Sequence, residues 1–131
     1  MAIYTSYFGN IKNLPGDVVA ISIAGKCPEW YNGLEFKTLA PKYKFFMEWK
    51  QNKDNDFYVK HFNEEVLLPL SADITVDKLY RLSKRKDIVL LCYEKPGTFC
   101  HRYIVSDWLC DNGYYVTEYG LSKEMKVKWV I

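Results

Sequence analysis

The sequence has little of what marks several protein classes. Seven glycines and five prolines among 131 residues are too few for a collagen-like or low-complexity chain. No apolar run approaches the roughly 18–20 residues of a membrane span. The N-terminus lacks a basic stretch followed by an apolar block, so no secretory signal is recognisable. We therefore expect a cytoplasmic protein without a membrane partner.

The net charge is small and the cysteines are few. A net charge of +2, from 18 basic and 16 acidic residues, gives no strong nucleic-acid signature. Four cysteines are present, at positions 27, 92, 100 and 110, and none forms a Cys-x-x-Cys pair. That spacing argues against a zinc knuckle or a thioredoxin-like motif, and we expect four reduced thiols.

What the chain does have is apolar and aromatic material. Hydrophobic residues make up 49% of the sequence and aromatic residues 17%, including 11 tyrosines. This is enough for the core of one domain spanning residues 1–131. Most rings will be buried, but the surplus of tyrosine leaves candidates for stacking on a planar ligand.

Periodicity along the chain predicts alternating strands and helices. Residues 18–24 and 87–93 are short and apolar throughout, as in strands that are buried on both faces of a parallel sheet. We predict an α/β fold: a small three-layer, Rossmann-like domain with a mostly parallel sheet of four or five strands. The expected strands are 3–8, 18–24, 87–93 and 114–119, and the expected helices are 41–52, 54–67, 75–85 (capped by Thr75) and 98–113 (capped by Thr98).

Two segments do not follow this pattern. Residues 25–41 have no clear period but contain Trp30 and Tyr31, so we interpret them as a ligand-site loop in which aromatic rings and Lys26 could cover a base. The alternative is a structural role, in which Trp30 only covers an edge of the core. The tail, residues 120–131, is open to two interpretations: an edge strand or an interface segment of a homodimer.

The carboxyl ends of parallel strands are where α/β proteins hold ligands. Three segments should converge there: 7–9, 25–26 and 92–94. The last one leads into residues 92–102, which resemble an anion cradle because the unpaired N–H groups of a first helical turn attract negative charge. His101, Arg102 and Lys95 could supplement it, and a positive environment would lower the pKa of Cys92 or Cys100.

The same segment carries a family resemblance. Its strand ends in Cys92-Tyr93-Glu94 and its helix opens with Cys100-His101-Arg102, a pattern that resembles the domain-of-unknown-function family 488. The resemblance extends to residues 3–8, to Gly25-Lys26 with Pro28, to 39–41 and to 108–109. It implies an α/β fold and a site around this motif, and no settled reaction.

Individual roles stay open at this point. Cys92 is either a nucleophile or a small buried strand residue, and its spacing of ten to Arg102 does not fit a phosphatase loop, which needs six. Glu94 is a general base, a ribose-hydroxyl acceptor or an ion-pair partner. His101 is an acid/base group or a structural cap. We expect no metal site, because the adjacent residues 100 and 101 should diverge on a helix.

These observations favour a binding protein without a cofactor, whose partner is a phosphate-bearing, nucleotide-like small molecule. Such a domain could sequester a cyclic-nucleotide signal, for example as a phage protein in viral counter-defence. The alternative is a thiol- or carboxylate-dependent enzyme that acts on a nucleotide or glycosidic substrate, with Cys92, Glu94 and His101 as catalytic candidates. The predicted ligand-binding residues are Tyr7, Gly25, Lys26, Trp30, Cys92, Glu94, Lys95, Cys100, His101 and Arg102.

Overall fold

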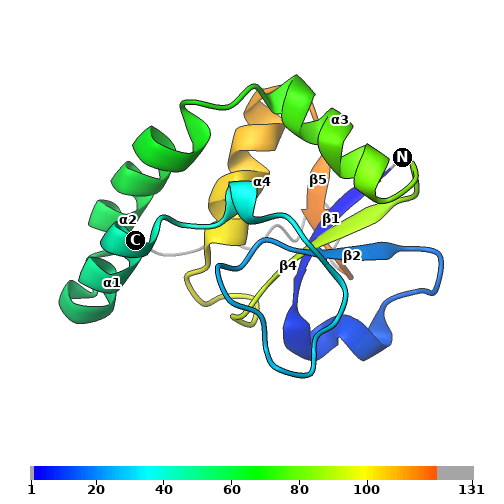
Figure 1. Ribbon diagram of the computed structural model, residues 1–131, viewed down its shortest axis with the longest axis horizontal. Coiled ribbons are helices and arrows are strands. Elements are labelled where there is room, and N and C mark those ends of the chain that lie inside the picture. Colours follow the sequence, from blue (N-terminus) through cyan, green and yellow to red (C-terminus); the bar gives the residue numbers. More distant parts are fainter. Residues whose placement is uncertain (1, 121–131) are drawn as a thin grey trace.

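Five strands form one parallel sheet within residues 2–120, the part of the chain that the computed structural model describes (Figure 1). They are β1 (Ile3–Tyr7), β2 (Val19–Ser22), β3 (Leu34–Glu35), β4 (Ile88–Cys92) and β5 (Val116–Glu118), in the order β3-β2-β4-β1-β5. The predicted α/β, Rossmann-like fold is therefore confirmed. The unpredicted strand, β3, is two exposed residues long, too short to show alternation.

The helices agree with the predicted pattern, with bounds that are shifted by up to three residues at their starts and ends, where a helix and the π-helical turn that continues it are taken together. Their bounds are α1 (Tyr43–Asn52), α2 (Asn55–Phe62), α3 (Ala72–Leu82) and α4 (His101–Asp111), with a π-helical turn, η3 (Asn63–Leu67), after α2 and the 3-10 helices η1 (Phe8–Asn13) and η2 (Lys37–Leu39). Ser71 caps α3 by accepting a hydrogen bond from the Ile74 N–H at 3.3 Å. Thr75 and Thr98 were thus wrong as caps, since Thr75 lies inside α3 and α4 begins after Cys100.

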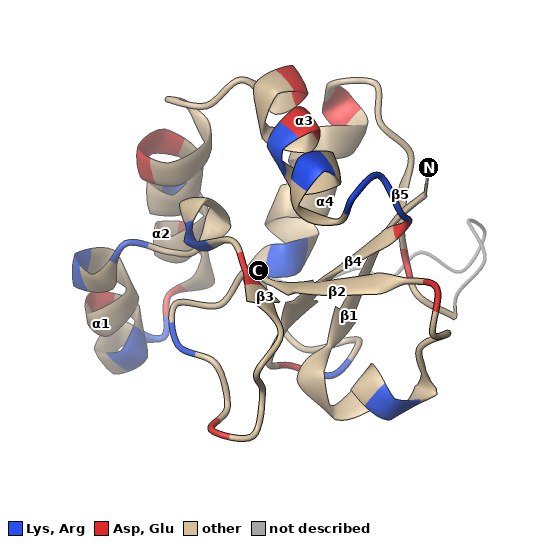
Figure 2. Cartoon of the chain, turned by 45° about the vertical axis from the view of Figure 1, so that its right-hand side comes forward, with Lys and Arg blue, Asp and Glu red and all other residues tan. Residues whose placement is uncertain are grey.

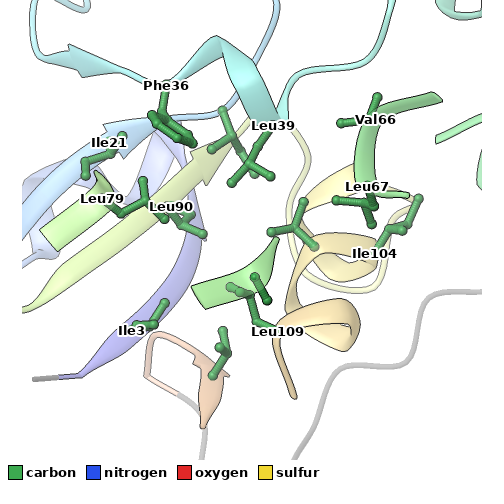
Figure 3. Packing of buried hydrophobic residues seen from close by; sticks show 14 of the residues in the cluster. Ile3, Ile21, Phe36, Leu39, Val66, Leu67, Leu79, Leu90, Ile104 and Leu109 are labelled. Atoms are coloured by element: carbon green, nitrogen blue, oxygen red, sulfur yellow. The ribbon is translucent and has the colours of Figure 1, made fainter. Parts of the chain in front are cut away.

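The two faces of the sheet are covered differently. Alternate residues such as Ile3, Ile21 and Leu90 belong to one buried cluster with side chains from all four described α-helices, which makes this face the main core. Figure 3 shows part of this cluster, including residues of α3 and α4. The opposite face, including Val89 and Leu91, is covered by residues of η1 and of the loop after β2. The third layer is therefore a 3-10 helix and a loop, and the α-helices lie on one side (Figure 1).

The strand order creates a natural opening between β2 and β4. The chain leaves β2 toward the β3 edge and leaves β4 toward the β5 edge, so the segments after these neighbouring strands separate. The register places Ser22 beside Leu91 and Tyr7 beside Cys92, which confirms that the three predicted segments follow adjacent strand ends.

The structure tests only part of two further expectations, the absence of a membrane span and the role of the tail. Within residues 2–120, each helix is too short or too polar to cross a membrane. The prediction for the tail lies outside the described residues, apart from Gly120.

Candidate functional site

A cavity of about 720 Å³ opens at the carboxyl ends of β2 and β4, between the sheet and α1. Its volume is within the usual range of small-molecule sites. The segments after both strands line it, together with residues of α1, one residue of α2 and the start of α4. The lining residues are Ala24, Gly25, Lys26, Lys37, Ala40, Pro41, Tyr43, Phe46, Met47, Trp49, Lys50, Tyr58, Cys92, Tyr93, Glu94, Phe99, Cys100 and His101.

Aromatic rings form most of one wall. Trp49 of α1 packs against Tyr58 and Phe99, with ring centroids 5.2 and 5.7 Å away, and the Tyr58 and Phe99 centroids are 5.1 Å apart. Tyr43, also on α1, is 68% exposed. A large exposed ring beside a cavity offers a stacking surface that the core does not need.

The charges at the cavity are mainly positive. Lys26, Lys37 and Lys50 line it and are exposed, whereas Glu94 is the lining carboxylate. Figure 2 shows the basic residues on α1 in blue. Lys50 also lies over the Phe46 ring, 5.3 Å from its centroid. A cleft with this charge balance attracts anions.

Two cysteines and a histidine form the floor of the cavity. Cys92 ends β4 and Cys100 precedes α4, and their sulfur atoms form a disulfide. This corrects the expectation of four reduced thiols; Cys27 and Cys110 are the described cysteines outside disulfides. The pairing could not be predicted, because the two cysteines are eight positions apart in the sequence and their contact depends on where the loop between them turns back.

His101 is held in one orientation. Its Nε2 lies 2.7 Å from the Ile23 carbonyl oxygen, so Nε2 carries the ring proton and donates a hydrogen bond to that oxygen. Its Nδ1 faces the Cys92 Sγ at 3.5 Å and presents a lone pair. The pKa of His101 is lowered to about 4, chiefly by burial and to a smaller extent by the Arg102 guanidinium, against the hydrogen bond to Ile23, which raises it. The imidazole is therefore neutral at neutral pH.

Arg102 has a different place from the one predicted for an anion contact. Its side chain is fully buried and forms a two-point ion pair with Glu118 of β5, with Nε–Oε1 and Nη2–Oε2 distances of 3.1 and 2.8 Å. Nη1 donates to the Glu94 carbonyl oxygen at 2.6 Å and Nη2 donates to the Tyr103 hydroxyl. These protein acceptors engage the guanidinium, which does not line the cavity.

The other predicted residues divide between the cavity and its surroundings. Gly25, Lys26, Glu94 and the Cys92–Cys100–His101 floor line the cavity. The remaining three do not: the Tyr7 ring lies beside the Arg102 guanidinium, Trp30 is 59% exposed and packs edge-on to Phe8, and Lys95 is exposed in the loop before α4.

Sequence reasoning missed the contribution of α1. The helical spacing of Tyr43, Phe46, Met47 and Lys50 predicted the helix over 41–52 and no part of it in the site. In the structure Phe45 is the one buried residue of this helix, and the stripe lines the cavity, with Phe46 also packed against the main core. A stripe that mixes tyrosine and lysine with apolar residues was the available signal, since a core face excludes lysine.

The family comparison agrees with the motif at this site. Residues 12–113 match DUF488-N3a, described as the active DUF488-N3 subclade, and the chain belongs to this DUF488 family. The match covers β2, β4, α4 and all the residues that line the cavity. No curated protein and no solved structure matches the chain.

Proposed function

We propose that the cavity binds a phosphate-bearing, nucleotide-like small molecule. The supporting observation is the combination of an aromatic wall with a lysine-lined mouth in one cavity of about 720 Å³. A base or another planar group can stack against exposed aromatic side chains such as Tyr43, and the phosphate then meets Lys26, Lys37 and Lys50.

In this proposal the lysines take the role that the sequence suggested for Arg102. The lysine ammonium group is a compact charge on a long, flexible side chain, so it can reach phosphate groups that lie at different positions in different ligands. The protein then acts by sequestering its ligand, including a cyclic-nucleotide signal, and releases it chemically unchanged.

A screen by thermal shift and calorimetry against mono-, di- and cyclic nucleotides tests this function. The best ligand should lose roughly 3–10-fold in affinity with Lys26→Gln or Lys50→Gln, as for a contact at the rim of a site. Tyr43→Ala should cost about 10-fold by removing a stacking surface. Lys12→Gln is the matched control, because Lys12 is an exposed lysine of η1 on the other side of the sheet.

Two results would contradict binding of this kind. One is a wild-type protein whose thermal midpoint no nucleotide raises. The other is an affinity that falls equally with Lys12→Gln, since this would reflect total charge and not the cavity. Mass spectrometry of the ligand after denaturation should recover it intact.

A specific observation also favours the second candidate, a thiol-dependent enzyme acting on a nucleotide or glycosidic substrate. After reduction of the disulfide, the Cys92 thiol faces the Nδ1 lone pair of a histidine that the Ile23 carbonyl orients. This is the arrangement of nucleophile, base and orienting group that activates a thiol. The description of the matched subclade as active also supports it.

In such a reaction the Cys92 proton would move to His101 Nδ1. The sulfur would attack the electrophilic carbon of the substrate, and the leaving group would depart with that proton. Water would then attack the same carbon, give a proton back to the sulfur, and release the product from Cys92. Reduced protein should then convert a substrate to product, and Cys92→Ser should abolish turnover whereas Cys110→Ser keeps it. Product formation that persists in Cys92→Ser would exclude this candidate.

A further inference from the structure

We propose that the reduced floor of the cavity is a zinc site with Cys92, Cys100 and His101 as its protein ligands. One ligand atom from each lies within 4.8 Å of the other two, and all three residues are buried. Two thiolates and an imidazole are a donor set that Zn²⁺ prefers, and three protein ligands are typical of zinc sites that keep one position open.

The spacing of two donor atoms already fits a zinc ion. Usual Zn–S and Zn–N lengths at a tetrahedral angle separate the sulfur and nitrogen by about 3.6 Å. Cys92 Sγ and His101 Nδ1 are 3.5 Å apart. The separation of these two atoms in the disulfide form thus matches the one that a shared zinc ion requires.

The histidine is also oriented as metal ligands are. Histidines that bind metals usually donate the other ring N–H to a carbonyl or carboxylate, which fixes the ring and its tautomer. Here Nε2 donates to the Ile23 carbonyl at 2.7 Å and leaves Nδ1 directed at the sulfur.

Cys100 can join because it is not a helical residue. It precedes α4 with extended backbone angles, φ −155° and ψ 141°, so its side chain is not bound to the helical spacing that would separate it from His101. The Cys92 and Cys100 Cα atoms are 7.0 Å apart. Disulfides usually span roughly 4.4–6.8 Å, so this backbone also accommodates two sulfurs that share an ion.

Reduction gives access to the site. A dithiol reductant supplies two electrons and two protons, becomes a disulfide itself, and converts the Cys92–Cys100 bond into two thiols. Zn²⁺ then displaces both thiol protons to solvent, and the two thiolates balance its charge. A disulfide oxidant that takes two electrons from the pair, and two protons from solvent, becomes a dithiol, re-forms the Cys92–Cys100 bond and releases Zn²⁺.

The open fourth position faces the cavity, since all three ligand residues line it. Water or an anionic group of a bound molecule can occupy it. The zinc site does not depend on the ligand class proposed above. It does compete with the thiol enzyme, because a zinc-bound Cys92 is a ligand and not a free nucleophile.

Metal titration of the full chain tests the proposal. Protein reduced with dithiothreitol and desalted under nitrogen is compared with the disulfide form, using Zn²⁺ against a chromophoric chelator and Co²⁺ as a spectroscopic probe. We expect one ion per reduced chain, bound at least 100-fold more tightly than by the disulfide form, with thiolate-to-cobalt charge-transfer absorption. Cys92→Ser, Cys100→Ser and His101→Gln should each weaken Zn²⁺ binding at least 10-fold, whereas Cys27→Ser should not change it.

Equal Zn²⁺ uptake by the reduced and oxidised wild type would overturn the proposal. Because that comparison needs no variant, it stands even if a substitution prevents folding. Zinc binding that survives loss of either floor cysteine would also overturn it. Failure of the nucleotide screen leaves these metal titrations unaffected, so the two proposals fail separately.

Discussion

His101 and Arg102 are neighbours at the start of α4, yet they belong to two different regions. His101 turns toward β2 and forms the cavity floor with the two cysteines. Arg102 turns toward β5 and enters a network with Glu118, Tyr103 and Thr5. The first region borders a cavity, whereas the second is closed and pairs a buried cation with a buried anion. Adjacent residues of one motif thus divide between the wall of a cavity and a buried ion-pair network.

The largest expected effect comes from breaking the closed region. Arg102→Met should lower the free energy of unfolding in urea by about 3–5 kcal/mol, because it leaves the Glu118 carboxylate buried without its cation. Arg81→Met is the matched control, since Arg81 forms an exposed ion pair with Asp77, and should cost less than about 1 kcal/mol. The double change Arg102→Met with Glu118→Met should recover much of the loss; a loss as large as that of Arg102→Met alone would contradict this account.

The second effect is on the cavity side and depends on pH. The unfolded chain takes up a proton at His101 near pH 6.5, but burial keeps the folded imidazole neutral to about pH 4. Stability from this group is thus present above pH 6.5 and is lost as the pH falls toward 4, by roughly 2 kcal/mol at pH 5. In the oxidised protein, His101→Gln should flatten this part of the urea-stability profile. Parallel profiles for the two proteins would refute the assignment.

A smaller effect should come from the edge of the closed region. The Thr5 hydroxyl donates to Glu118 Oε1 at 2.6 Å and both groups are buried. Thr5→Val keeps the shape and removes that donor, so it should cost about 1–2 kcal/mol of unfolding free energy. Thr117→Val, on the opposite face of β5, serves as the comparison and should cost less.

The smallest expected effect sharpens the contrast. Lys26 is exposed at the cavity, so Lys26→Gln should change the unfolding free energy by less than about 0.5 kcal/mol. The same change should weaken the best nucleotide ligand, as proposed above. A variant that lost stability instead would place Lys26 among the structural residues.

The sequence was informative where a signal is local. The apolar strands at 18–24 and 87–93 predicted the parallel sheet, and the rule for strand ends predicted where the loops meet. The sequence was not informative where a contact depends on which way a side chain points. The Cys-His-Arg motif does not indicate that the side chain of residue 101 points toward β2 and that of residue 102 toward β5. Glu118 lies sixteen residues after Arg102, and their pairing depends on the order of the strands in the sheet.

The same limit applies to Cys100 and to α1. The expected divergence of residues 100 and 101 assumed that both are helical, but the helix begins one residue later. The stripe on α1 had the spacing of a core face, and only the tertiary fold shows that it borders a cavity.

The position of α1 has a consequence for how this pocket can change. Phe45 alone anchors the helix as a fully buried side chain, whereas five other residues on it line the cavity. Cys92 ends β4, His101 begins α4 and Cys100 directly precedes that helix, and both elements carry core residues. Substitutions on α1 can therefore reshape one wall of the cavity without changing Cys92, Cys100 or His101. Under the proposed function, the residues that select a ligand would lie apart from the residues of the cavity floor.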